Sequence, residues 1–205
     1  MLTGNPVRKE ILDCKLTPGQ ARATFGLDPD TPTVLVVGGS LGARTLNEAI
    51  QAALPRFTGS NVQLIWQTGK AYGDKGAVAA KNMKGIVVTQ FLTDMATAYR
   101  AATLVVSRAG AGSISELELL GKPCILVPSP NVAEDHQTKN AHALSDRGAA
   151  ITVPDAEARD TLADTVFRTV TDTAALENMS AEIQKLALPD SDNIIAAEIA
   201  KIVNF

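Results

Sequence analysis

The stretch VLVVGGSLGAR at residues 34–44 places an apolar run directly before a short glycine-rich segment. The apolar run is typical of a buried strand, and the glycines let backbone N–H groups approach an anion closely. A helix that begins directly after such a loop points its positive end at the same spot. The stretch alone leaves a tight turn and a phosphate cradle both open, because Gly-Gly-x-x-Gly is not the dinucleotide pattern Gly-x-Gly-x-x-Gly.

Short apolar runs alternate with helical segments along most of the remaining chain. Strands are expected at 33–37, 62–67, 85–89, 103–107, 124–127 and 149–153. Helices are expected between them at 43–54, 71–81, 94–102, 113–120 and 135–147. This alternation predicts an α/β fold, a Rossmann-like parallel six-stranded sheet with flanking helices.

The two ends of the chain depart from this alternation. Residues 1–30 read as irregular apart from a short helix at 18–25. After the last expected strand, three helices are predicted without a strand between them, at 156–171, 173–186 and 191–203.

The composition is that of an ordinary globular protein, with 205 residues, 45% hydrophobic and 20% charged. A net charge of −3 argues against a general nucleic-acid binder. Cys14 and Cys124 lie far apart and form no metal or redox motif, which indicates a reduced, cytoplasmic chain. No signal peptide is recognisable, and no apolar run approaches the about 20 residues that a membrane span needs.

The unusual loops all follow expected strands. The glycine-rich loop follows the first strand, and QFLTDM (90–95) follows the third. RAGAGS (108–113) follows the fourth, and PSPNVAEDHQTKN (128–140) follows the fifth. Ligands of open parallel sheets bind outside the carboxyl ends of the strands. We therefore expect these loops to line one ligand site.

Two charged residues near the fourth strand each have two interpretations. Ser113-x-x-Glu116 matches a capping box, in which Glu116 returns to the backbone of its own helix, but Glu116 can equally contact a ligand. Arg108 can pair with a phosphate or be a plain surface charge.

Alternatives also remain open in the loops after the third and fifth strands. Phe91, Leu92 and Met95 suit either the core or the walls around a flat base. His136 is a solvated helix residue or, with Gln137, a group that binds a polyhydroxylated ligand. The sequence shows no Ser-His-Asp arrangement, metal-ligand cluster or Walker loop.

Five motifs together resemble the MurG family of peptidoglycan glycosyltransferases. In chain order these are GNPVR (4–8), VLVVGGSLGAR (34–44), TQFLTDMATAY (89–99), SRAGAGSISEL (107–117) and PSPNVAEDHQTKNA (128–141). The resemblance covers essentially this whole chain but only the carboxyl-terminal half of the family's two-domain GT-B chain. It implies a UDP-sugar donor-binding domain at 1–205, with 1–30 leading into it and 156–205 forming the C-terminal helices. The N-terminal acceptor domain is then expected to be absent, as in an excised domain.

The resemblance also implies an activity, an inverting transfer without a metal or other cofactor. N-acetylglucosamine would move from UDP-N-acetylglucosamine to lipid I, giving lipid II in peptidoglycan synthesis. The general base, the lipid I site and the membrane contact are expected on the missing domain, so the isolated domain should be inactive. The full enzyme is expected to be cytoplasmic and peripheral at the inner face of the plasma membrane.

Carried over by motif, the resemblance implies these donor-binding residues: Arg8, Gly39, Ser40, Phe91, Leu92, Met95, Gly110, Ala111, Ser113, Glu116, His136 and Gln137. Ser40 and its glycine neighbours would meet the diphosphate, with Arg8 nearby. The backbone of Leu92 would read the uracil edge between walls formed by Phe91 and Met95.

The remaining implied contacts concern the ribose and the sugar. Glu116 would accept hydrogen bonds from the ribose hydroxyls, which favours its ligand role over the cap. Ala111 and Ser113 would face the sugar and phosphates. His136 and Gln137 would hold the sugar hydroxyls, although some family members have Gln-Gln at these two positions.

Two rival functions share parts of this pattern. A UDP-N-acetylglucosamine 2-epimerase has the same architecture and donor, but it needs acid–base groups near the sugar, for which only His136 and Glu116 are candidates here. A nucleotide-binding subunit of a split glycosyltransferase would carry the same loops and need a partner chain.

Overall fold

The computed structural model describes residues 3–39 and 43–203, in which six strands form one parallel sheet. The strands are β1 (Thr33–Val37), β2 (Gln63–Gln67), β3 (Ile86–Thr89), β4 (Leu104–Ser107), β5 (Cys124–Leu126) and β6 (Ile151–Thr152). Their order is β3-β2-β1-β4-β5-β6, with every neighbouring pair parallel. The expected Rossmann-like sheet is confirmed, and its winding reverses between β1 and β4.

The central strands are buried on both faces, which explains their continuous apolar sequence. In β1, Leu35 and Val37 belong to one core, whereas Val34 and Val36 belong to the other. Because successive side chains of a strand point to opposite faces, a sheet covered on both sides needs apolar residues at every position.

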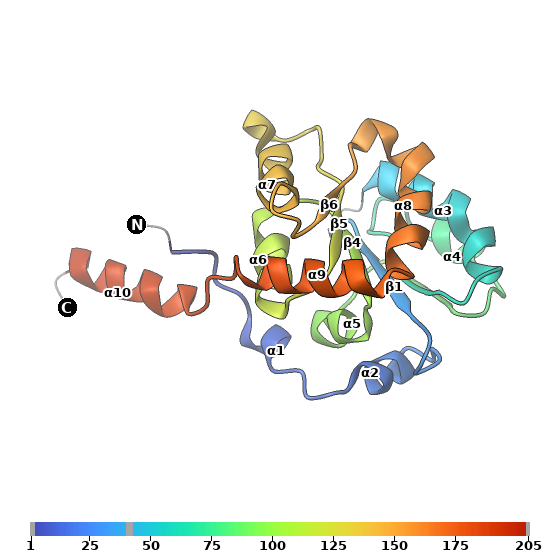
Figure 1. Cartoon of the computed structure of the whole chain (residues 1–205), viewed down its shortest axis with the longest axis horizontal. Coiled ribbons are helices and arrows are strands. Elements are labelled where there is room, and N and C mark those ends of the chain that lie inside the picture. The colour runs from blue at the N-terminus through green and yellow to red at the C-terminus, as the bar shows by residue number, and fades with distance from the viewer. Residues whose placement is uncertain (1–2, 40–42, 204–205) are drawn as a thin grey trace.

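Helices cover both faces of the sheet (Figure 1). One core includes residues of α1 (Lys9–Leu12), α2 (Pro18–Thr24), α5 (Met95–Ala101), α6 (Ala111–Leu120) and α7 (His136–Ser145). The other includes residues of α3 (Arg44–Thr58), α4 (Lys75–Ala79) and α8 (Ala158–Val170). Helix α9 (Thr173–Gln184) contacts both α6 and α8 and so links the two layers.

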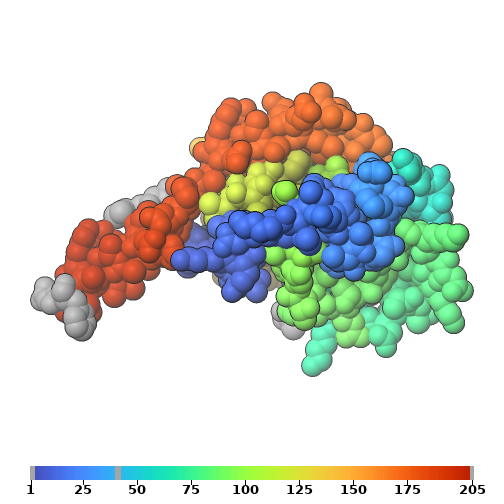
Figure 2. All heavy atoms as spheres, turned by 90° about the horizontal axis from the view of Figure 1, so that it is seen from below, coloured from blue at the N-terminus to red at the C-terminus, as the bar shows by residue number. Residues whose placement is uncertain are grey.

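Helix α10 (Ser191–Val203) projects away from this body (Figures 1 and 2). Its apolar side chains Ile199, Ile202 and Val203 are exposed. Among the helices of the described ranges, none combines the length and apolarity that crossing a bilayer requires.

Helix α3 runs past the end expected at residue 54. It continues to Thr58 with Pro55 inside its last turns. Proline lacks a backbone N–H and usually ends a helix, but Phe57 is 2% exposed in the core, and its packing holds the extra turn in place.

Strand β6 is shorter than the expected 149–153. The turn after α7 passes through Gly148 at φ +69° and returns the amide of Ala149 to the carbonyl of Leu144. The chain therefore reaches the sheet only at Ile151.

Two short helices also differ from expectation. Helix α1 lies in the segment read as irregular, and α4 begins at Lys75 rather than residue 71. Two hydrogen-bonded turns precede α4, closed by the amides of Tyr72 and Gly73, and they use the residues that were expected to be helical.

Candidate functional site

A cavity of about 220 Å³ opens where the winding of the sheet reverses. The position is the one at which open α/β sheets bind their ligands. We call it the switch-point cavity. It is lined by Arg8, Val37, Gly39, Gln67, Phe91, Leu92, Thr93, Met95, Tyr99, Ser113 and Glu116.

The loops after β1, β3 and β4 thus contribute to one site, as expected. The predicted donor residues that line it are Arg8, Gly39, Phe91, Leu92, Met95, Ser113 and Glu116. The predicted residues that do not line it are Gly110, Ala111, His136 and Gln137. Ser40 lies outside the described residues.

Glu116 does not act as a helix cap, so the capping-box interpretation is wrong. Helix α6 begins at Ala111 after Gly110, and no side chain caps it. Ser113 therefore sits inside the first turn instead of ahead of it. The Oε2 atom of Glu116 accepts a hydrogen bond of 2.8 Å from the Tyr99 hydroxyl.

Tyr99 is a fixed donor to Glu116. The phenol is 2% exposed, and its burial, followed by the nearby Glu116 charge, raises the pKa of Tyr99 well above its usual range. The Tyr99 hydroxyl therefore stays protonated and holds one carboxylate oxygen. Each carboxylate oxygen has two lone pairs, so Glu116 keeps further acceptor capacity toward the cavity.

Gln67 connects two loops of the cavity. Its Nε2 donates to the carbonyl of Gly39 at 3.1 Å, and its Oε1 accepts from the amide of Leu92 at 3.1 Å. The Leu92 N–H is therefore already bonded inside the protein. Sequence reasoning missed Gln67, although a buried amide ending the apolar run LIWQ (64–67) was the available signal.

The loop after β1 needs its glycines for two different reasons. A Cβ on Gly38 would lie 2.7 Å from the amide nitrogen of Ala43, because the end of the strand and the start of α3 approach closely there. Gly39 has φ +80°, a left-handed conformation that side chains rarely adopt.

The starts of the helices around the cavity differ in capping. Helix α5 is capped by Asp94, whose side chain accepts from the amide of Thr97. Among the described residues, no side chain caps the starts of helices α3 and α6, which follow Ala43 and Gly110. Uncapped N–H groups together with the helix dipole attract anions. The capacity for anion binding therefore lies at α3 and α6.

The loop after β5 stays apart from the switch-point cavity. His136 is exposed, and its Nδ1 lies 2.8 Å from the Ala133 carbonyl. The Oε1 of Gln137 accepts from the amide of Ser129 at 2.9 Å. Both side chains are thus held within their own loop.

Arg108 is neither a surface charge nor a group facing the cavity. Its Nη1 lies 2.5 Å from Oδ1 of Asp155, and these two side chains are 16% and 17% exposed. The sequence had left a phosphate partner and a plain surface charge open for Arg108, and the structure instead shows an internal ion pair with Asp155.

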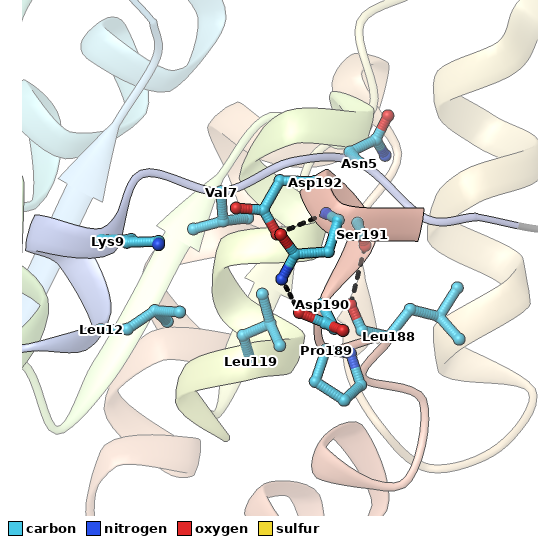
Figure 3. A pocket seen from close by; sticks show the side chains of 11 residues that line it. Asn5, Val7, Lys9, Leu12, Leu119, Leu188, Pro189, Asp190, Ser191 and Asp192 are labelled. Atoms are coloured by element: carbon cyan, nitrogen blue, oxygen red, sulfur yellow. Dashed lines mark hydrogen bonds between the residues drawn. The ribbon is translucent and has the colours of Figure 1, made fainter. Parts of the chain in front are cut away.

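A second cavity, of about 210 Å³, lies beside the start of α10 (Figure 3). Its polar side chains bond within the protein, since Ser191 donates to the Leu188 carbonyl, Asn193 donates to Asp190, and Asn5 donates to the Ser115 hydroxyl. Of the described donor-binding candidates, none lines it. Among residues 3–39 and 43–203, no group of three or more His, Cys, Asp or Glu side chains is placed to hold a metal ion.

Comparison with known proteins gives a consistent result. Residues 33–194 match the family model described as the glycosyltransferase family 28 C-terminal domain. The chain is 53% identical over 206 residues to a transferase of Bacteroides thetaiotaomicron, covering 98% of this chain and 55% of that protein. Its name is UDP-N-acetylglucosamine–N-acetylmuramyl-(pentapeptide) pyrophosphoryl-undecaprenol N-acetylglucosamine transferase.

Two further similarities point the same way. An equally named transferase of Phocaeicola vulgatus is 50% identical over 207 residues, covering 100% of this chain and 55% of that protein. The crystal structure of Acinetobacter baumannii MurG superposes with a TM-score of 0.73 and 29% identity, covering 84% of this chain and 52% of that one. The chain thus spans about half the length of these relatives.

Proposed function

The chain belongs to the glycosyltransferase family 28 C-terminal domain, and from this membership we propose that the switch-point cavity binds the nucleotide of UDP-N-acetylglucosamine. In this role the chain is the donor-binding domain of an inverting transferase that makes lipid II from lipid I. The observation that carries the proposal is the convergence of an acceptor carboxylate, apolar walls and a glycine loop in one cavity.

The base is proposed to lie beside Phe91. This side chain is 58% exposed although it is large and apolar, and it borders the cavity together with Met95. Stacking a flat ring here would remove apolar surface from water. Because the Leu92 amide is held by Gln67, the Leu92 carbonyl would accept from the N–H of uracil.

The ribose is proposed to lie at Glu116. Its carboxylate has one oxygen fixed by Tyr99 and further lone pairs for the ribose hydroxyls. Bonds from neutral hydroxyls to a charged acceptor are stronger than neutral pairs. Glu116 would therefore contribute much of the affinity for the nucleoside.

The diphosphate is proposed to lie between the uncapped starts of α3 and α6, next to Gly39, Ser113 and Arg8. The N–H groups there would stabilise the charge that develops on the leaving UDP, as helix N-termini do elsewhere. The sugar would extend from the diphosphate past Gly110 and Ala111 toward His136 and Gln137. Ser40 completes the proposed donor contacts.

The acceptor half of the reaction is proposed for the part of the relatives that this chain does not span. Lipid I, the general base and the contact with the inner face of the plasma membrane would belong there. Transfer requires both substrates in reacting geometry, which can be worth about 7–11 kcal/mol of barrier. The 205 residues alone should thus bind the donor without making lipid II.

Calorimetric titration with UDP, UDP-N-acetylglucosamine, ADP and GDP tests the proposal. We expect the uridine nucleotides to bind and to protect against thermal unfolding more than ADP or GDP at equal concentration. Equal protection by all three diphosphates would mean that only the diphosphate is recognised. Incubation with UDP-N-acetylglucosamine and a lipid I analogue is expected to yield no lipid II, while formation of the 2-epimer would favour the epimerase alternative.

A further inference from the structure

Asp155 joins two segments that are distant in sequence. It is the first residue of a short 3-10 helix (Asp155–Glu157) that follows β6. Its Oδ2 accepts from the Thr45 hydroxyl at 2.9 Å, while its Oδ1 pairs with Arg108 at 2.5 Å. One carboxylate thus serves both partners with separate oxygens.

Arg108 extends this connection across the sheet. It directly follows β4, and the same Nη1 atom also donates to the carbonyls of Val127 and Pro128 at 3.0 and 3.2 Å. The carboxyl ends of β4 and β5 are therefore tied to the residue that follows β6. The Arg108 and Asp155 side chains are mostly buried, so their ion pair is poorly accessible to solvent.

Thr45 is the residue through which α3 bonds to Asp155. It is the second residue of α3, a helix whose start is capped by no side chain of the part of the chain that the structure describes. Gly38, which follows β1, packs closely against Ala43, which directly precedes α3. The first turn of α3 is thus bonded to a residue outside the switch-point cavity.

We propose that Asp155 is a positioning residue that, through Thr45, fixes the first turn of α3 for a diphosphate ligand. The proposal rests on the proposed function, since it takes the diphosphate to lie at this helix start. Asp155 itself does not line the cavity. Its negative charge is balanced by Arg108, so the carboxylate can orient the helix without repelling an anion nearby.

The test compares UDP with uridine in Thr45→Val, which keeps the side-chain shape and removes the hydroxyl. The Kd for UDP is expected to rise about fivefold to tenfold, because the Thr45–Asp155 bond is internal to the protein and only part of its free energy is needed to order the first turn of α3 again when UDP binds, while the Kd for uridine stays unchanged. Thr45→Ser keeps a hydroxyl and should restore UDP binding. Thr58→Val is the matched control in the last turn of α3, where the hydroxyl bonds the carbonyls of Leu54 and Pro55 within its own helix.

Asp155→Asn gives a second route, because it keeps the volume and removes the charge that holds Arg108. It should also weaken UDP binding more than uridine binding. The inference is wrong if both ligands weaken equally in these variants, or if neither weakens. Failure of the unaltered protein to bind UDP would instead contradict the proposed function, so the two ideas fail separately.

Discussion

The switch-point cavity and the Arg108–Asp155 pair lie at the same edge of the sheet but use their charges differently. In the cavity, Glu116 is held by one neutral donor and keeps acceptor capacity toward open space. Arg108 and Asp155 are mostly buried and neutralise one another. The two carboxylates therefore differ in what they leave for a ligand, since Asp155 uses both oxygens on Arg108 and Thr45, whereas Glu116 uses one oxygen on a neutral hydroxyl.

Removing one member of the buried pair should have the largest effect. Arg108→Met leaves Asp155 buried without its counter-ion, which costs about 3 kcal/mol, at the lower end of the range for such pairs because both side chains keep some exposure. Urea unfolding measures this loss. Arg56→Met, which breaks the exposed pair with Asp164, is the control and should cost under about 1 kcal/mol. Equal losses of unfolding free energy in the two variants would show that the Arg108–Asp155 pair is no more important to stability than an exposed pair.

Truncating Glu116 should weaken UDP binding more than it lowers the stability of the fold. Glu116→Ala is expected to weaken UDP binding by about 1.5–3 kcal/mol, as for hydrogen bonds to a charged group. Calorimetry measures the affinity, and a thermal melt reports separately on the unpaired Tyr99 hydroxyl. Glu118→Ala, two residues further along α6, is the matched control outside the cavity. Unchanged affinity in Glu116→Ala would restrict this residue to a structural role.

The Tyr99 hydroxyl should have a smaller effect. Tyr99→Phe removes one hydrogen bond and keeps the ring, so we expect a loss of about 1 kcal/mol in the free energy of unfolding. UDP affinity should fall only slightly, because Glu116 retains its charge. A loss of affinity as large as that of Glu116→Ala would show that Glu116 binds the nucleotide only when the Tyr99 hydroxyl holds its carboxylate in place.

Glu118 adds a pH-dependent test on the same helix. Half-burial raises the pKa of Glu118 from 4.5 to about 7, so the folded protein holds a proton that the unfolded chain releases. The stability that the folded protein gains by holding this proton is fully present below pH 4.5 and is lost as the pH rises through 7. Solvent screening reduces it to below about 1 kcal/mol.

Unfolding of Glu118→Gln across this pH range checks the prediction. The decline in stability from acid to neutral pH should be shallower in the variant than in the unaltered protein. Glu10→Gln replaces an exposed glutamate of α1 and should leave the profile unchanged. Parallel profiles for Glu118→Gln and the unaltered protein would show that Glu118 is well solvated.

The sheet was predictable from sequence because its signal is local. Four central strands are buried on both faces, and their uninterrupted apolar runs can be read without knowing what packs on them. The end of α3 was missed for the opposite reason. Pro55 favours a stop, and only the packing of Phe57 against distant residues of the core overrides it.

The site was predictable where a recognisable motif carries it and hidden where the neighbouring sequence is typical of core. Phe91 and Glu116 stand in recognisable segments, and the structure places both at the cavity. Gln67 and Tyr99 lie inside a strand and a helix, where their sequence context resembles core. Their roles depend on the distant atoms to which their polar groups bond, and the hydrophobic periodicity of the sequence does not indicate those partners.

The two hydrogen bonds of Gln67 have a consequence for mutational tolerance. One end of its amide must donate to the Gly39 carbonyl and the other must accept from the Leu92 amide. Glutamate would set two acceptors against each other at Gly39. Leucine would leave the Gly39 carbonyl and the amide of buried Leu92 without this partner, and asparagine is one methylene too short. A saturation library at residue 67, selected for uridine nucleotide binding, should therefore return glutamine far more often than residues chosen for size or hydrophobicity alone.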